Sequence, residues 1–205
     1  MMWNERYCDA FSSYGREPND FLKVVAQNIP KGPVLCIAEG EGRNAVYLAK
    51  LGYEVTAMDA SDVGLQNAQK LAQENQVTLT TIHADLEHFD FQSNYWSGIV
   101  SIWAHLPPTI RKKVHANLVK GLQQNGVFVL EAYAPRHLQT TGIGGPPVVE
   151  LLMDKDIVQQ ELQGLDFELI QECERQITEG TYHQGTSITT QILGRKIIEP
   201  KHLID

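Results

Sequence analysis

A short apolar run that leads through two glycines into a helical segment constrains the fold of this chain more than any other feature. Residues 34–45 read VLCIAEGEGRNA, where the apolar run favours a buried strand and the residues after the second glycine favour a helix. Gly40 and Gly42 permit a tight turn and let a ligand lie against the backbone where the helix starts. Such a unit often holds phosphates, but Glu39 and Glu41 are unusual neighbours for an anion.

The alternation of strand and helix continues along the chain. Apolar, β-branched runs predict strands at 32–38, 53–59, 77–85, 96–104 and 125–134, and segments of helical period predict helices at 43–52, 61–75 and 107 to about 124. Ser61 precedes its helix as a good N-cap. Because parallel strands need a crossover, usually a helix, this rhythm predicts a parallel sheet that is covered by helices on both faces.

The pattern changes in the last third of the chain. A loop rich in glycine and proline at 140–148, TTGIGGPPV, precedes a predicted helix at 153–163. Two β-rich runs follow at 166–177 and 186–198, and their short polar connection predicts an antiparallel hairpin that closes the sheet. A helical piece from about Asn19 to Asn28 precedes the first strand. The predicted fold class is α/β: a Rossmann-like, seven-stranded, mostly parallel sheet with an antiparallel C-terminal hairpin and helices on both faces.

Composition narrows the partners and the compartment. The 205 residues carry a formal net charge of −8 and no basic stripe, which disfavours nucleic acid and anionic membranes as partners. The three cysteines are scattered without CxxC spacing, which suits a reducing cytoplasm and gives no zinc site. No apolar run approaches the ~18 residues that cross a bilayer, and the first residues lack a signal-peptide pattern. We therefore expect a soluble cytoplasmic protein, a monomer or weak dimer, that acts on a small molecule and holds no metal.

Two acids follow predicted strands and extend the glycine loop into a candidate binding crevice. Asp59 ends the second predicted strand, roughly twenty residues beyond the loop, where an acid accepts hydrogen bonds from the two hydroxyls of a ribose. Asp85 ends the third predicted strand. Because the carboxyl ends of parallel strands meet at one edge, these residues point to a single crevice. The alternative is that both acids only cap the helices that follow.

Two enzyme classes share this arrangement, and the glutamates distinguish them. A dinucleotide-dependent oxidoreductase would place a pyrophosphate at the loop, where Glu39 and Glu41 would repel it. S-adenosylmethionine has no phosphate and presents an ammonium and a sulfonium, which tolerate nearby carboxylates. The chain also lacks a Tyr-x-x-x-Lys pair for hydride chemistry. These features favour a methyltransferase, with an NAD(P)-dependent oxidoreductase or a non-catalytic S-adenosylmethionine-binding protein as alternatives.

Motifs along nearly the whole chain resemble the class I S-adenosylmethionine-dependent methyltransferases, and within them the small enzymes grouped with the tellurite-resistance and thiopurine methyltransferases. The resemblance rests on WNERY (3–7), YGREPNDFL (14–22), VLCIAEGEGRNAVYLA (34–49), VTAMDAS (55–61), ADL (84–86), GIVSIWAHLP (98–107), TGIGGPP (141–147) and ERQITEGTYHQG (174–185). It implies one domain over residues 1–205, with an N-terminal helical lid at 1–31, a cofactor-binding core at 32–134 and a substrate-side loop, helix and hairpin at 135–205.

The resemblance also implies which residues contact the cofactor. From the methionine end to the adenine they are Ala38, Gly40 and Gly42 at the amino-acid tail, Trp103 and Ala104 near the sulfonium, Asp59, Ala60 and Ser61 at the ribose and adenosine, and Asp85 and Leu86 at the adenine. The chain departs from the family at Cys36 and Ala38, where an acid and a glycine are common. We interpret Glu39 as a replacement carboxylate for the cofactor's amino group; the alternative is that it faces solvent.

The acceptor side is less defined. Soft nucleophiles such as a thiol or a chalcogen oxyanion need no base, and His105 and His183 are candidate bases if a proton must leave. Arg43 either balances the charge of an anionic acceptor or is itself a solvated surface charge. Tyr14 is expected over the pocket as part of the lid. The loop at 140–148 is either a gate or a passive crossover, and the sequence assigns no catalytic residue.

Overall fold

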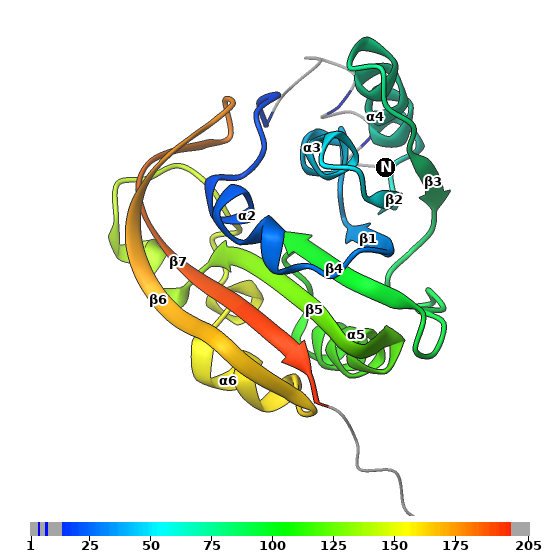
Figure 1. Cartoon of the computed structure of the whole chain (residues 1–205). Helices are drawn as coiled ribbons and strands as arrows, with labels where there is room; N and C mark the ends of the chain where they lie inside the picture. The colour runs from blue at the N-terminus through cyan, green and yellow to red at the C-terminus, as the bar shows by residue number, and fades with distance from the viewer. Residues whose placement is uncertain (1–3, 5–6, 8–13, 198–205) are drawn as a thin grey trace, which may run out of the picture.

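The computed structural model describes residues 4, 7 and 14–197, and its elements follow the predicted alternation (Figure 1). In chain order they are α2 (Asp20–Val25), η1 (Ala26–Asn28), β1 (Pro33–Ile37), α3 (Arg43–Lys50), β2 (Glu54–Asp59), α4 (Asp62–Glu74), β3 (Thr80–His83), β4 (Trp96–Ile102), α5 (Pro108–Gly121), β5 (Leu122–Tyr133), η2 (Pro135–Gln139), η3 (Val149–Leu151), α6 (Lys155–Glu161), β6 (Leu165–Glu179) and β7 (His183–Lys196). Among these described residues, no helix is both long and apolar enough to span a bilayer.

The seven strands form one sheet in the order β3-β2-β1-β4-β5-β7-β6. The first five strands pair in parallel, and β7 lies antiparallel between β5 and β6. This confirms the predicted sheet, including its C-terminal hairpin. The chain leaves β1 toward β2 and β3 and returns to β4 on the other side, so the strand order reverses between β1 and β4. In open α/β sheets, ligands bind outside the carboxyl ends of the strands at this reversal.

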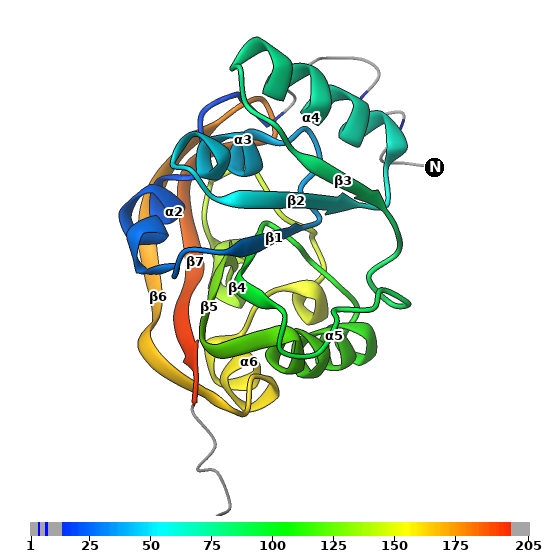
Figure 2. The same cartoon turned by 45° about the vertical axis from the view of Figure 1, so that its right-hand side comes forward.

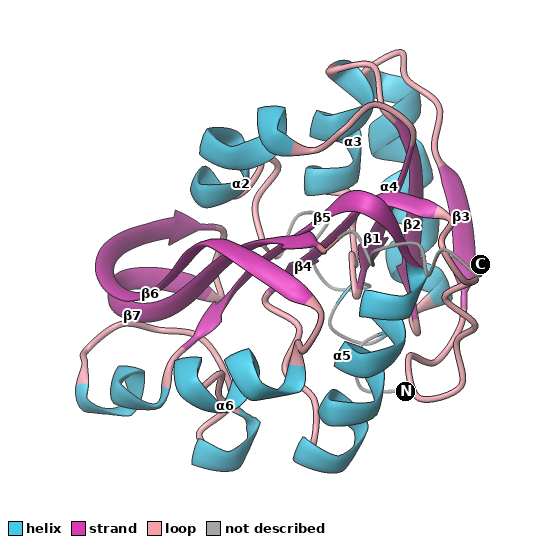
Figure 3. Ribbon diagram, turned by 60° about the horizontal axis from the view of Figure 1, so that its bottom comes forward, coloured by secondary structure: helices cyan, strands magenta, loops and turns pink. Residues whose placement is uncertain are grey.

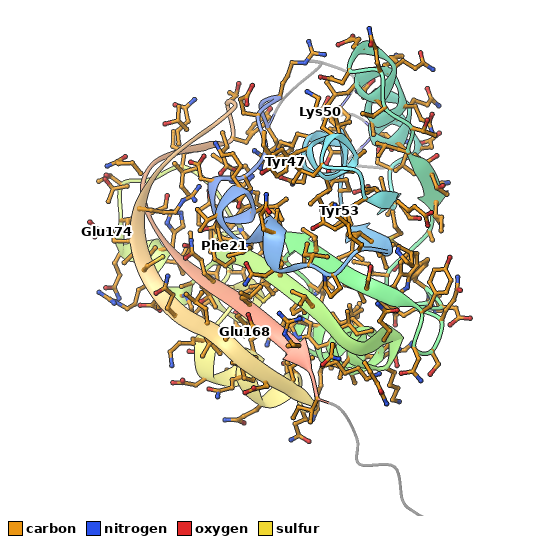
Figure 4. The ribbon with its side chains drawn as sticks, in the orientation of Figure 1. Phe21, Tyr47, Lys50, Tyr53, Glu168 and Glu174 are labelled. Carbon is orange, nitrogen blue, oxygen red and sulfur yellow. The ribbon has the colours of Figure 1, made fainter. Side chains whose placement is uncertain are left out.

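Helices cover both faces of the sheet, as predicted. Figures 2 and 3 show α2, α3 and α4 on one face and α5 and α6 on the other. Each face has its own cluster of buried apolar side chains. Because both faces are covered, β4 is buried along its whole length. Figure 4 labels Phe21 and Tyr53 on the α2–α3 face, where the Tyr53 hydroxyl donates to the carbonyls of Ala26 and Ile29, each at 2.9 Å.

The β6–β7 hairpin is long, and its turn lies beside the segment that precedes α2 (Figure 1). A side chain at Gly15 would reach within 3.1 Å of the backbone nitrogen of Gly180, so the two segments are in direct contact there. Strand β6 forms one edge of the sheet, and Figure 4 labels Glu168 and Glu174 along it. Charged side chains on an edge strand oppose edge-to-edge pairing with another chain.

Several predicted boundaries differ from those of the structure. Strand β3 ends at His83 rather than at Asp85, so Asp85 lies in the turn that follows. Helix α5 ends at Gly121 rather than near residue 124, and β5 begins at the next residue. The strand predicted to begin at Asn125 therefore starts earlier, and Asn125 lies inside β5, where the pairing with β4 shifts register and Asn125 has φ of 63°. Asparagine tolerates this left-handed conformation better than most residues, which makes it suited to a bulge.

Candidate active site

The glycine loop joins β1 to α3 at the point where the strand order reverses. Gly40 and Gly42 have φ of 60° and 86°, which glycine adopts without strain. Asp59, at the end of β2, holds this loop: the backbone N–H of Gly40 donates to its Oδ2 at 2.8 Å, and the N–H of Ser61 donates to its Oδ1 at 2.7 Å. The loop and the second strand therefore form one rigid corner, with Asp59 between them.

Asp59 is buried, and burial raises the pKa of its carboxyl although the backbone N–H groups of Ser61 and Gly40 oppose that shift. Each carboxylate oxygen can accept two hydrogen bonds, and the amides of Gly40 and Ser61 use one position on each oxygen. Asp59 thus presents both oxygens at the corner, where neighbouring hydroxyls such as those of a ribose could donate to them. The geometry of this corner is therefore compatible with the ribose-binding role expected for Asp59.

Two aromatic residues of the expected lid lie at the crevice. A side chain added at Gly40 would come within 2.5 Å of the Tyr7 hydroxyl, so Tyr7 covers the backbone of the loop. Burial, and then the charge of Asp59, raise the pKa of the Tyr7 phenol. The Tyr14 ring lies 6.2 Å from the Tyr7 ring and 4.9 Å from the His183 ring, measured between centroids. Of the remaining lid, residues 1–3, 5–6 and 8–13 lie outside the described part of the chain.

Glu39 turns inward and caps α3. The backbone N–H of Ala45 donates to Glu39 Oε1 at 2.8 Å. An N–H in the first turn of a helix has no acceptor within the helix, so Glu39 supplies the acceptor that Ala45 needs. Burial raises the pKa of the Glu39 carboxyl to about 7. The interpretation that Glu39 faces solvent is therefore wrong. Cys36, where the family commonly has an acid, is fully buried in β1.

We expect the E39Q variant to change how stability depends on pH. The folded-state pKa of Glu39, about 7, lies above its ordinary value of 4.5. The protonated Glu39 carboxyl therefore contributes to the free energy of unfolding fully below pH 4.5, and this contribution is lost as the pH rises through 7 and the buried group becomes charged. Glutamine keeps the oxygen that caps Ala45 and carries no charge. E39Q should exceed the wild type in free energy of unfolding by roughly 1 to 3 kcal/mol at pH 8 and match it near pH 4.5, measured by urea denaturation. Parallel pH profiles for the two proteins would contradict this expectation.

The adenine end of the expected site is partly assembled. Ser61 caps α4, because its Oγ accepts from the N–H of Gly64 at 3.0 Å, and it donates to Asn4 Oδ1 of the lid at 2.7 Å. Leu86 is buried. Asp85 is exposed and accepts from the N–H of Glu87 at 2.8 Å. Its expected contact with the adenine stays a prediction.

A stack of rings follows β4 on the acceptor side. Trp103 has φ of 60°, an unusual conformation for a bulky residue, and its ring stacks on Tyr133 at 4.5 Å and on His183 at 4.9 Å between centroids. The Tyr133 hydroxyl is 2.6 Å from His183 Nδ1. Ala104 is buried beside Trp103. The structure thus brings Trp103 and His183 together and adds Tyr133, which was not predicted from the sequence.

His105 lies just beyond this stack, with its ring 5.9 Å from that of Tyr133. Its Nδ1 donates to the Leu151 carbonyl at 2.9 Å, since a carbonyl can only accept, and the neutral tautomer therefore has its lone pair on Nε2. Burial lowers the pKa of His105 to about 4. His105 is therefore neutral at physiological pH and a weak base.

The loop at 140–148 is docked rather than free. Ile143 pairs with Gln184 at the start of β7, with N–H to carbonyl distances of 2.6 and 2.9 Å. Gly144 and Gly145 lie so close to the Tyr133 ring that a side chain at either position would come within 3 Å of it. The loop therefore forms a wall behind Tyr133.

A buried charged network joins the lid, the cofactor loop and the hairpin. Arg43 Nη2 lies 2.5 Å from Glu179 Oε2, and Arg175 Nη2 lies 2.7 Å from Glu179 Oε1. Arg43 is thus buried in an ion pair rather than at the surface. Glu131 and Asn19 complete the network, with Asn19 Nδ2 donating to Glu131 Oε2 at 2.5 Å and to Glu179 Oε1 at 3.1 Å. In the sequence, the signal was Glu131, a charge inside the apolar run VFVLEAYA.

No cluster of three or more His, Cys, Asp or Glu side chains is placed to hold a metal ion within residues 4, 7 and 14–197.

Comparison with known proteins agrees with this fold. Residues 34–126 match a family described as "Methyltransferase domain". The chain is 32% identical over 104 residues, 47% of its length, to the uncharacterized methyltransferase YodH of Bacillus subtilis (strain 168). It is 26% identical over 165 residues, 69% of its length, to the ubiquinone biosynthesis O-methyltransferase of Rickettsia akari (strain Hartford). The chain spans 45% and 65% of the lengths of these two relatives.

Solved structures share the fold at low sequence identity. One comes from work on the conversion of a disulfide bond into a thioacetal group during echinomycin biosynthesis, with a TM-score of 0.74, 16% identity, and coverage of 98% of this chain and 93% of that one. TehB from Haemophilus influenzae has a TM-score of 0.70 and 19% identity, with coverage of 86% of this chain and 61% of TehB. Residues 34–126, somewhat less than half of the chain, therefore match a methyltransferase domain, and the whole chain has the fold of these solved structures.

Proposed function

We propose that this protein transfers a methyl group from S-adenosylmethionine to a small-molecule acceptor. The observation that carries the proposal is the corner formed by the glycine loop and Asp59 at the reversal of strand order, with Glu39 and Glu41 beside the loop. The glycines leave backbone open to a ligand, and the acids suit a cationic amino-acid tail better than a pyrophosphate. Both features support this cofactor over a dinucleotide.

The residues expected at the site would hold the cofactor along its whole length. Ala38, Gly40 and Gly42 would hold its amino-acid tail, with Glu39 near its ammonium, and Asp59 would hold its ribose. Ala60, Ser61, Asp85 and Leu86 would surround the adenosine, and Trp103 and Ala104 would close the pocket. When bound, the cofactor supplies an electrophilic methyl group on a sulfonium. The protein's part is to align the acceptor, since the reaction consumes a positive charge and a dry pocket does not penalise it.

Isothermal titration calorimetry tests which cofactor binds and distinguishes a methyltransferase from an NAD(P)-dependent oxidoreductase. We expect binding of S-adenosylhomocysteine and none of NADH or NADPH. Binding of a nicotinamide cofactor instead would favour an oxidoreductase. If S-adenosylhomocysteine binds but no thiol, selenite, catechol or amine is methylated, a non-catalytic binding protein is favoured. A loss of S-adenosylhomocysteine affinity in E39Q would support Glu39 as the anchor of the ammonium, and unchanged affinity would limit Glu39 to capping α3.

We infer that the acceptor is a soft nucleophile such as a thiol or a chalcogen oxyanion. The imidazole that follows β4, His105, has a pKa of about 4, which makes it a poor base for an alcohol or an amine. Burial raises the pKa of the Tyr133 phenol, so this hydroxyl stays protonated. A thiolate needs no base at the enzyme. The structural relative that is linked to disulfide and thioacetal chemistry also supports an acceptor of this type.

The pH profile of methyl transfer should then follow the acceptor rather than the enzyme. For a thiol with pKa near 8.5, we expect kcat/KM at saturating cofactor to rise about tenfold per pH unit below that value and to level off above it, because only the thiolate attacks. A more acidic aryl thiol should shift the inflection down by the difference in the two thiol pKa values. An inflection that stays near pH 6.5 for both thiols would instead indicate a histidine base.

A further inference from the structure

The carboxylate of Glu179 is bound by four donors from separate parts of the chain. Its Oε2 accepts from Arg43 Nη2 at 2.5 Å and from the indole Nε1 of Trp103 at 2.7 Å. Its Oε1 accepts from Arg175 Nη2 at 2.7 Å and from Asn19 Nδ2 at 3.1 Å. Glu179 is buried at the end of β6. Its hydrogen bonds to Arg43 and Asn19 are buried, and those to Trp103 and Arg175 are partly buried. One side chain therefore links α2, α3, the segment after β4, and β6.

The bond to Trp103 differs in kind from the other three. Arg43 and Arg175 balance the charge of Glu179, and Asn19 is the N-cap of α2, so these contacts are what any buried carboxylate requires. A carboxylate with two arginines and an amide does not need an indole as well. Trp103 meanwhile sits at φ of 60°, which costs of order 1 to 3 kcal/mol for a bulky residue and persists only where its surroundings impose it. The hydrogen bond from its indole to Glu179 is a contact that can impose it.

The position of the indole decides the shape of the acceptor side. Trp103 stacks on both Tyr133 and His183, and those two residues contact each other through the hydroxyl and Nδ1. Without Glu179 the Trp103 indole can turn about its side-chain bonds. The indole would then no longer stack on both Tyr133 and His183. The same carboxylate contacts Arg43, the first residue of the helix that follows the glycine loop. The acceptor wall is thus linked through Glu179 to the first residue of α3.

We propose that Glu179 is a positioning residue, which holds the Trp103 indole against Tyr133 and His183 and thereby shapes the acceptor pocket. This inference rests on the proposed methyl transfer for its catalytic consequence. The hydrogen bond itself is independent of that function, so the two can fail separately.

The E179Q variant tests the proposal by spectroscopy and by kinetics. Glutamine keeps the shape of the Glu179 side chain and one of its acceptor oxygens, and it removes the negative charge. We expect the Trp103 indole N–H resonance, assigned by its loss in W103F, to move upfield in E179Q. We also expect kcat/KM for thiophenol, or for whichever thiol, selenite, catechol or amine the wild type methylates, to fall by about tenfold to a hundredfold, which is the loss expected for a hydrogen bond to a charged group. Affinity for S-adenosylhomocysteine should change less than about threefold, since Glu179 is not among the residues that would contact the cofactor.

The W103F variant keeps the proposal testable if E179Q does not fold. Phenylalanine retains a stacking ring and lacks the N–H, so the charged network stays intact. W103F should show the same loss of kcat/KM as E179Q, and the double variant should lose no more than either single variant. Glu172, which lies on the same strand and pairs with Arg136 at 2.8 Å, is the matched control, and E172Q should match the wild type.

An indole resonance that is unmoved in E179Q overturns the proposal whether or not an acceptor has been found. Full turnover in W103F, or losses that add in the double variant, also overturn it. Failure of S-adenosylhomocysteine to bind the wild type would instead overturn the proposed function and leave the indole measurement to decide the geometry.

Discussion

Replacement of Asp59 by alanine is expected to lower the affinity for S-adenosylhomocysteine by about a hundredfold or more. The carboxylate is buried at the end of β2, where the two hydroxyls of a ribose would donate to its oxygens. Each hydrogen bond to a charged group contributes about 1.5 to 3 kcal/mol, so the loss of two such bonds gives a factor of this size. The measurement is calorimetry of D59A at a temperature where circular dichroism shows that the variant is folded.

The variant also removes the partner of two backbone amides, so stability must be measured beside affinity. Gly40 N–H and Ser61 N–H both donate to Asp59, and D59A should lose about 1 to 3 kcal/mol of unfolding free energy through them. Asp90 is a matched control, because it is exposed and likewise accepts from a backbone amide, that of Gln92, at 2.9 Å. D90A should bind as the wild type does. If D59A binds within about threefold of the wild type, Asp59 serves only to hold the loop and cap the helix.

The sheet and the cofactor corner could be predicted because their signals are local. Buried parallel strands are continuous apolar runs, and a glycine pair before a helix has few other uses, so residues 34–45 and Asp59 identify the crevice from the sequence. Strand ends were less certain, as at β3, because the apolar run continues past the last paired residue. His83 is the last residue of β3 that pairs with β2, whereas the run extends to Asp85.

The acceptor side could not be predicted, because it is assembled from contacts between distant residues. Glu179 meets Arg43 across 136 positions and Trp103 across 76. Nothing in the neighbourhood of either residue indicates its partner. Tyr133 was missed for the same reason: a tyrosine at the end of an apolar strand is equally suited to the core, and only His183 and the glycines of the 140–148 loop show that it belongs to the site.

The G42A substitution is expected to have the largest effect on stability. Gly42 has φ of 86°, where a side chain costs roughly 1 to 2 kcal/mol. A side chain there would also lie 2.5 Å from the Cβ and 2.8 Å from the Cα of Ala68, so α3 and α4 would have to separate. Overpacking of this kind costs about 1 to 3 kcal/mol. We therefore expect G42A to lower the free energy of unfolding by about 2 to 5 kcal/mol, measured by urea denaturation.

The G52A variant, at the other end of α3, separates the cost of the backbone conformation from the cost of the close contact with α4. Gly52 follows α3, has φ of 84°, and a side chain there would meet no atom within 4 Å. G52A therefore carries the conformational cost alone, and we expect a loss of roughly 1 to 2 kcal/mol. The difference between the two variants measures how closely α3 and α4 pack at the glycine loop. Equal losses would mean that the helices give way without cost, and Gly42 would then be required for its backbone conformation and not for the contact with Ala68.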